Sequence, residues 1–456
     1  MIFMNIPFLK DLKILVPESE IKTFKGGIHP DPMKSATSKL PIVEVPAPKT
    51  LVFPLSQHLG APATPCVKVG DTVLAGQKIA EASGFVSANL HSSVSGTVVA
   101  IEERMTHFGV MTNSIIIEND GEDTNEFESE PRNFKDFTPA ELVDMVREAG
   151  IVGMGGATFP THVKLSPPEG KTIDTVIING AECEPCLTSD HRAMLETPKE
   201  VLTGLKIMLK IFGLKKGYIG IENNKADAIE LLTNYAKLEK DYEIEIVPLK
   251  VKYPQGSEKH LINAITGRTV PVGKLPLDVG CVVNNIDTCA AIARAVVYGM
   301  PLISRIVTVT GDCIKNPTNA RVRIGTPMAD VIEFLGGLKA HPKKVIMGGP
   351  MMGIAVPNLD VPVVKGSSGI VALSKRSALL RHEGVCVRCG KCVAACPMGL
   401  SPLFLKEAIV KGDFDKMKEL DITSCIECGS CSFVCPGANN PSQSIKAARL
   451  RLRNMG

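Results

Sequence analysis

Eight cysteines in the last part of the chain recur at a spacing that suits metal binding. The stretches "CVRCGKCVAACP" and "CIECGSCSFVCP" both read C-x-x-C-x-x-C-x-x-x-C-P. In such a run three thiolates on a tight turn bind three irons of one cubane, and the fourth cysteine binds the other cluster. We therefore predict two 4Fe-4S clusters with crossed ligands, which are Cys386, Cys389, Cys392 and Cys435 for cluster one, and Cys396, Cys425, Cys428 and Cys431 for cluster two. Two structural zinc sites are the alternative, but zinc usually takes its four ligands from separated C-x-x-C pairs.

A second stretch, "IVGMGGATFPTHVKL", could hold a phosphate or a planar ring. It carries Gly153, Gly155 and Gly156 close together, and Lys164 follows them. Glycine lets the backbone approach a ligand without a Cβ in the way. No Lys-Ser or Lys-Thr follows Gly156, and Thr158 breaks the dinucleotide pattern G-x-G-x-x-G, so the loop fits neither standard phosphate motif. A tight turn without any ligand is the alternative interpretation.

The predicted clusters need a source of single electrons. A hydride donor delivers two electrons at once, and flavin is the usual converter because it is stable in a one-electron state. We therefore expect the glycine loop to hold a flavin that exchanges electrons with the clusters. No side chain is assigned a catalytic role.

Composition limits the class of protein. The chain of 456 residues is long enough for about three domains, and 44% hydrophobic with 22% charged residues is ordinary for a globular protein. A formal net charge of +3 gives no reason to expect nucleic acid as a partner. We find no long apolar run and no signal peptide, so we expect a soluble or peripheral protein in the cytoplasm. There the 14 cysteines need a purpose other than disulfides; we expect Cys66, Cys281, Cys289 and Cys313 to be buried small apolar side chains.

The elements that must position these residues change character along the chain. Residues 49–118 alternate as short strands and resemble the two halves of a lipoyl carrier fold, but the tip "SANLHSSV" has no lysine, which favours a structural module. From 138 to about 300, strands such as "TIDTVIING" alternate with helical stretches such as "EVLTGLKIMLKIFG", which predicts a parallel sheet with ligands beyond its carboxyl ends. A small α+β unit follows, and the chain then becomes helical. We place the domains at 1–130, 131–300, 301–368 and 369–456.

The middle of the chain resembles the NADH-oxidising subunit of respiratory complex I. "GMGGATFPTHVKL" is similar to that family's flavin loop, G-R-G-G-A-G-F-P-T-G-x-K, and "NGAECEP", "GIENN" and "VVNNIDT" resemble its later segments in order. Ala181 and Met154 depart from the Asp and Arg of that family. The resemblance implies that FMN is held in the loop of Gly153 by Gly155, Gly156, Lys164, Asn179, Asn284 and Asn285, and that NADH stacks over it near Phe159, Glu182, Glu184 and Glu222.

The whole chain resembles the RnfC family, a component of the Rnf ion-translocating electron-transport complex. "FKGGIHP", the β module, the flavin loop, "YPQGSEKHLINAITGR" and the doubled cysteine run occur in that family's order. The resemblance implies a multidomain α/β protein with an N-terminal barrel-sandwich (lipoyl-like) β module, a Rossmann-like FMN/NADH domain, a β-grasp (SLBB) module and a C-terminal helical ferredoxin-like domain with two 4Fe-4S clusters.

The same resemblance implies a function. The chain would be a peripheral subunit on the cytoplasmic side of the cell membrane, docked on the other subunits of the Rnf membrane complex. It would pass electrons between NADH and, indirectly, ferredoxin while the complex moves Na⁺ or H⁺. Two alternatives stay open at this point: a cobalamin reductase-type protein with the same cofactors, and an electron-carrier scaffold that binds no pyridine nucleotide.

Overall fold

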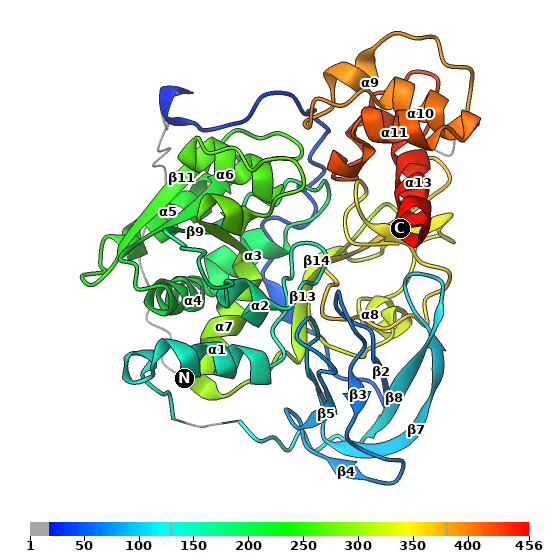
Figure 1. Ribbon diagram of the computed structural model, residues 1–456. Coiled ribbons are helices and arrows are strands. Elements are labelled where there is room, and N and C mark those ends of the chain that lie inside the picture. The colour runs from blue at the N-terminus through cyan, green and yellow to red at the C-terminus, as the bar shows by residue number, and fades with distance from the viewer. Residues whose placement is uncertain (1–17, 128–129, 379–381, 456) are drawn as a thin grey trace.

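The computed structural model describes residues 18–127, 130–378 and 382–455. Figure 1 shows a β module, an α/β layer, a sheet between them and a helical part at the other end of the molecule. The strands form four sheets. The fold has the four kinds of unit that the sequence predicts.

The N-terminal module is built from two small antiparallel sheets. One has the order β2 (Thr50–Pro54), β8 (Met111–Asn119), β7 (Gly96–Met105) and β4 (Thr72–Val73); the other has the order β3 (Thr64–Pro65), β5 (Lys78–Glu81) and β6 (Leu90–His91). The tip that would carry a modified lysine in a carrier domain, residues 87–96, is buried. Ser93 Oγ donates to Ile324 O at 2.6 Å, and Lys365 Nζ donates to Asn89 O at 2.6 Å. The tip is therefore packed against other parts of the chain, as a structural module requires.

A parallel four-stranded sheet forms the α/β domain. Its order is β11 (Glu243–Leu249), β10 (Lys216–Glu222), β9 (Thr175–Gly180) and β12 (Cys281–Asn285). Alternate residues of β9 pack on opposite faces: Val176 and Ile178 lie in the core of α4 (Pro198–Ile211) and α7 (Ile286–Tyr298), and Ile177 lies in the core of α6 (Glu258–Thr266). β9 has its sequence neighbour β10 on one side and β12 on the other, so the strand order reverses between β9 and β12. Ligands of such sheets bind at this switch point.

A mixed six-stranded sheet joins the two preceding units. Its order is β1 (Ile42–Glu44), β14 (Thr318–Arg323), β13 (Ser304–Thr310), β17 (Gly369–Leu373), β15 (Lys344–Met347) and β16 (Ile354–Ala355), with α8 (Met328–Phe334) packed on it. β1 and β17 lie outside the expected range of 301–368. They pair with β14 and β13, whose backbone groups would otherwise be free at an edge.

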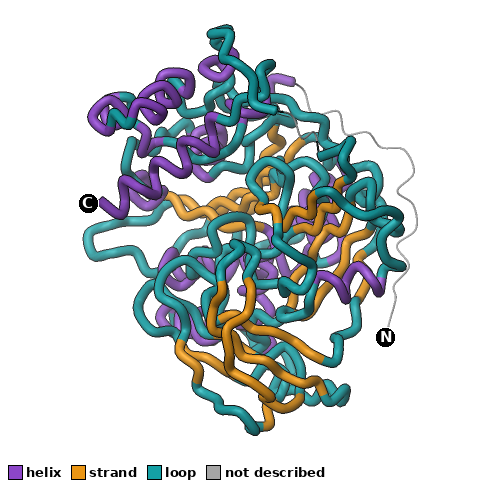
Figure 2. Tube along the Cα trace, turned by 90° about the vertical axis from the view of Figure 1, so that its right-hand side faces the viewer, coloured by secondary structure: helices purple, strands orange, loops and turns teal. Residues whose placement is uncertain are grey.

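The C-terminal part is helical. It contains α9 (Lys391–Ala394), α10 (Pro402–Lys411), α11 (Phe414–Glu419), α12 (Ser430–Phe433) and α13 (Pro441–Met455). Leu405, Ile422 and Ile445 form its small core. Figure 2 shows this helical part at one end of the molecule, beyond the strands of the sheets. None of the helices in the described residues has the length and apolar character that a bilayer crossing needs.

Most of the remaining cysteines match their expected surroundings. Cys281, Cys289 and Cys313 are buried, as predicted. The prediction for Cys66 is wrong, because this residue follows the short strand β3 and its side chain is exposed.

Candidate functional site

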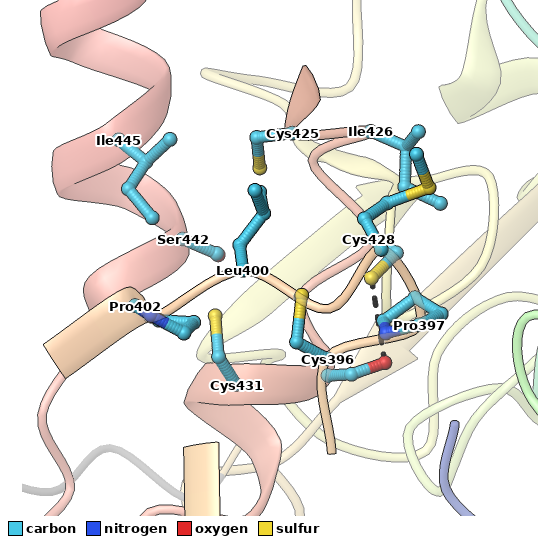
Figure 3. Close-up of a pocket in the computed structure, with 13 residues that line it drawn as sticks. Cys396, Pro397, Leu400, Pro402, Cys425, Ile426, Cys428, Cys431, Ser442 and Ile445 are labelled. Atoms are coloured by element: carbon cyan, nitrogen blue, oxygen red, sulfur yellow. Dashed lines mark hydrogen bonds between the residues drawn. The ribbon is translucent and has the colours of Figure 1, made fainter. Parts of the chain in front are cut away.

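Four cysteines from both runs line one cavity. Cys396 of the first run lies with Cys425, Cys428 and Cys431 of the second around a cavity of about 350 Å³, open solvent included (Figure 3). The turn that carries the three cysteines is tight, because Glu427 (φ 57°) and Gly429 (φ 78°) are left-handed. α12 then begins and presents Cys431.

A second cavity has the matching set. Cys386, Cys389 and Cys392 line about 340 Å³ together with Cys435, the last cysteine of the other run. Its turn has the same left-handed residues, Arg388 (φ 52°) and Gly390 (φ 72°). The structure therefore brings together the two crossed sets of four that the spacing predicts. Cys386 and Cys389 are exposed, whereas Cys428 and Cys431 are buried.

The donor sets of both cavities fit 4Fe-4S clusters. Each cavity offers four thiols from one turn and one distant residue, which is the arrangement of a two-cluster ferredoxin. Among the described residues, no three His, Cys, Asp or Glu side chains are grouped to hold a single metal ion. Burial raises the pKa of Cys425 to about 11 and that of Cys431 to about 12, so iron binding has to release protons from these thiols.

The glycine loop meets the carboxyl end of β12. A Cβ on Gly155 would lie 3.0 Å from Cβ and Nδ2 of Asn285, and a Cβ on Gly156 would meet nothing within 4 Å. Gly155 is thus packed on the strand end, and Gly156 faces open space. The loop is closed at its base, because Gly153 N donates to the carbonyl of Phe159 at 2.9 Å.

The amides expected around a flavin lie at the ends of β9 and β12, on both sides of the switch point. Asn179 Nδ2 donates to Gly256 O at 2.7 Å, and its Oδ1 accepts from Ala181 N at 3.2 Å. Asn285 caps α7, accepting from Asp287 N at 2.9 Å. Asn284 is buried, and its Oδ1 has no hydrogen-bond partner among the described residues. An orphaned buried acceptor beside an open glycine loop fits a site for a polar ligand such as FMN.

Lys164 lies at the same strand end. It projects from α2 (Thr161–Leu165) and donates to Val283 O at 3.0 Å while pairing with Glu258. Its charge is therefore held close to the glycine loop and the amides of β12. The predicted FMN residues come together at the crevice between β9 and β12.

The three glutamates expected near NADH make separate internal contacts. Glu182 accepts from Asp190 N at 2.7 Å, and Glu222 pairs with Lys225 at 3.2 Å. Glu184 accepts from the backbone N–H groups of residues 351 and 352 at 3.0 and 2.9 Å, and burial raises its pKa to about 7. The structure does not bring them together as one free carboxylate surface.

Two residues that the sequence analysis missed support the crevice. Asp190 accepts from Asn285 Nδ2 at 2.6 Å, and burial, followed by the nearby charges of Glu182 and Asp287, raises its pKa to about 7. Arg305 reaches across from β13 and donates to Asp287 Oδ2 at 2.6 Å. Neither residue belongs to a recognisable motif, so only their position in the fold reveals them.

Comparison with known families matches every part of the chain. Residues 22–122 match the RnfC barrel sandwich hybrid domain, 146–294 the Nuo51 FMN-binding domain, 306–355 the SLBB domain and 378–436 the 4Fe-4S dicluster domain. Among solved structures, an NAD⁺-reducing [NiFe]-hydrogenase in the H₂-reduced state is similar, with a TM-score of 0.48 and 19% identity over 68% of this chain and 61% of that chain.

Curated relatives match over most of their length, and each is the RnfC-type component of its complex. The chain is 49% identical to that of the proton-translocating ferredoxin:NAD(+) oxidoreductase complex of Clostridium ljungdahlii, covering 88% of this chain and 87% of the relative. It is 49% identical to that of the Na(+)-translocating complex of Acetobacterium woodii (86% and 89%). It is 44% identical to that of the ion-translocating oxidoreductase complex of Rhodobacter capsulatus (86% and 76%).

Fold, site and matches define an electron-transfer protein with an FMN-binding domain and a 4Fe-4S dicluster domain. More particularly, the chain belongs to the RnfC family of ion-translocating oxidoreductase complexes. This membership favours the Rnf interpretation over the cobalamin reductase weighed from the sequence.

Proposed function

We propose that this chain is the NADH-binding flavin and iron–sulfur subunit of an Rnf-type ferredoxin:NAD⁺ oxidoreductase. The observation that carries the proposal is the contact between its two halves: Tyr253 of the α/β domain donates its hydroxyl to the carbonyl of Cys428 at 2.7 Å. A flavin crevice and a cluster cavity thus belong to one packed unit. The names of the relatives support ferredoxin and NAD⁺ as the two ends of the reaction and Na⁺ or H⁺ as the transported ion.

Each part of the crevice has a distinct task in this proposal. FMN supplies the conversion between two-electron and one-electron transfer when it is bound. Gly155 and Gly156 let the backbone approach the flavin, and Lys164 provides positive charge where reduction adds negative charge. Asn284 offers an unpaired buried amide oxygen. Asp190 orients Asn285 through the 2.6 Å hydrogen bond described above.

The two cavities differ in their surroundings, which supports an order of electron transfer. The cavity of Cys428 lies against the α/β domain, whereas Cys386 and Cys389 of the other cavity are exposed. We therefore place cluster two next to the flavin and cluster one at the outward end. Cluster one would exchange electrons with another subunit of the Rnf complex, on the cytoplasmic side of the membrane.

Anaerobic reconstitution with iron, sulfide and FMN, followed by titration with NADH, tests this function. We expect about eight irons and eight sulfides per chain. NADH should bleach the flavin absorbance first and then reduce the clusters. Zinc or about four irons would overturn the two-cluster assignment, and a flavin that NADH leaves oxidised would favour the electron-carrier scaffold.

A further inference from the structure

Residues 22–29, which we call the N-terminal strap, run along the edge of the α/β domain. Lys22 N donates to Pro248 O at 2.9 Å, so the strap begins beside β11. Further on, Ile28 and Tyr253 exchange both backbone hydrogen bonds, at 2.8 and 2.9 Å. The strap contains the "GGIH" segment, to which neither the flavin crevice nor the clusters assign a role.

Two glycines bring the strap into close contact with both halves of the molecule. Gly26 (φ 88°) would place a Cβ 3.3 Å from the carbonyl oxygen of Cys396, and Gly27 (φ 79°) would place one 2.5 Å from Tyr253 O. Both have left-handed backbones that other residues rarely adopt. The strap therefore passes between a ligand loop of cluster two and the α/β domain, where only glycine fits at residue 27.

Tyr253 contacts the second ligand loop of the same cavity. Its side chain is 1% exposed and lies in a buried cluster with Ile28, Ala395 and Cys428. Its hydroxyl donates to Cys428 O at 2.7 Å. A buried hydroxyl in this position has no water to replace its partner, so losing the hydrogen bond has a cost.

His260 holds the first ligand loop from α6. Its Nε2 lies 3.0 Å from the carbonyl oxygen of Pro397, and its Nδ1 lies 2.9 Å from Ser257 Oγ. The ring packs on Phe24 of the strap, with ring centroids 4.5 Å apart. The α/β domain thus contacts the loops of both Cys396 and Cys428.

We propose that the strap, Tyr253 and His260 form a clamp that fixes the position of cluster two against the flavin domain. Tyr253 and His260 are positioning residues, because they contact the ligand loops and not the electron carriers. The proposal rests on the proposed function, in which cluster two exchanges electrons with the flavin. The clamp keeps that distance constant, while cluster one faces outward.

Tyr253→Phe removes one hydroxyl and tests the clamp in the reconstituted full chain. Tyr298→Phe, on a side chain that is 40% exposed at the end of α7, is the matched control. We expect backbone amides of residues 425–431 to exchange hydrogen roughly fivefold faster in Tyr253→Phe only, the effect of one ordinary hydrogen bond on local opening. Iron and FMN contents should match those of the wild type.

A spectroscopic measurement separates positioning from mere stability. After rapid mixing with NADH, Tyr253→Phe should bleach its flavin at the wild-type rate but show the paramagnetic signal of reduced cluster two more slowly. His260→Leu should have the same effect and loosen residues 396–400, and His260→Gln, which keeps a side-chain N–H donor, should restore both.

Two outcomes overturn the clamp: exchange rates that are equal in Tyr253→Phe and Tyr298→Phe, or faster exchange with unchanged reduction of cluster two. Failure of the proposed function gives a different result, in which NADH leaves the wild-type flavin oxidised. The exchange comparison needs no nucleotide and decides in that case whether the clamp holds the cluster loops.

Discussion

The side chains around the crevice between β9 and β12 place opposite charges at short range. Lys164 pairs with Glu258, and Glu182 lies 3.7 Å from Lys34. Asp190 is the exception, because its buried carboxyl has like charges nearby and a raised pKa. Single substitutions should therefore have large and distinct effects here.

Lys164→Ala should weaken FMN binding about 10- to 150-fold, the range expected for the loss of a hydrogen bond to a charged group. Both clusters should persist, because the cysteine cavities lie in another domain. Gel filtration followed by flavin and iron analysis measures both. Lys171→Ala, at an exposed pair with Asp278 of 2.8 Å, is the control that should retain FMN. Unchanged affinity in Lys164→Ala would contradict the assignment of this residue.

Asp190→Asn should stabilise the protein more at about pH 8 than at about pH 5. Burial raises the pKa of Asp190 from 3.8 to about 7, so the folded protein keeps a proton that the unfolded chain loses. The proton-linked stability is complete below the unfolded value and is lost as pH rises through about 7, with a total on the order of a few kcal/mol.

Calorimetric melting temperatures at both pH values test this prediction. Asn at residue 190 still offers an oxygen to Asn285, so the hydrogen bond survives. Asp144→Asn on α1 (Pro139–Glu148), where the carboxylate is exposed beside Arg147, should give the same change at both pH values. An equal shift in Asp190→Asn at the two values would show that this carboxyl is ionised in the fold.

Among the secondary-structure elements, β13 links the six-stranded sheet to the flavin domain. Arg305 extends from this strand, is 2% exposed, and donates to Asp287 at the start of α7 and to Ser367 O at 3.1 Å. It also lies 3.4 Å from Met154 O in the glycine loop. One strand therefore supports both the helix and the loop that border the crevice.

Arg305→Met should destabilise the protein by about 3–5 kcal/mol, because it leaves the buried carboxylate of Asp287 without this partner. Denaturant unfolding measures the loss. Arg305→Met combined with Asp287→Asn should recover a large part of it, since the second change removes the uncompensated charge. Purely additive losses would mean that the pair does not act as a unit.

The short helices α9 and α12 exchange their last cysteines, and this crossing is testable. Cys435→Ser should remove the same paramagnetic signal as Cys386→Ser, because both line one cavity. Cys396→Ser should instead remove the signal that Cys425→Ser removes. Loss of the Cys425-dependent signal in Cys435→Ser would reject the crossed arrangement.

Across the molecule as a whole, the α/β domain joins the nucleotide end to the cluster end. With ferricyanide as the acceptor, the isolated chain should oxidise NADH faster than NADPH. A carboxylate near the 2′-phosphate costs about 1–3 kcal/mol, or about 5- to 150-fold in affinity. Lys225 pairs with Glu222 and Lys34 lies near Glu182, so we expect the lower end of this range. Equal rates with both nucleotides would reject the electrostatic argument.

The parts of this protein whose chemistry is local can be predicted from the sequence. Cysteine spacing predicts both cavities, including the crossing, because a tight turn brings three thiols together wherever it occurs. Strand and helix periodicity predicts the parallel sheet, whose carboxyl ends gather Gly155, Lys164 and Asn285. The order of the domains follows from the same local patterns.

Which distant segments meet depends on the tertiary structure. β1 and β17 complete a sheet that lies mostly outside their predicted units, and Arg305 pairs with Asp287 across two domains. The strap lies between Tyr253 and Cys396, and Asp190 becomes buried beside Asn285. None of these contacts has a spacing or period in the chain, because each depends on the packing of surfaces that are far apart in sequence and that come together only when the domains fold against one another.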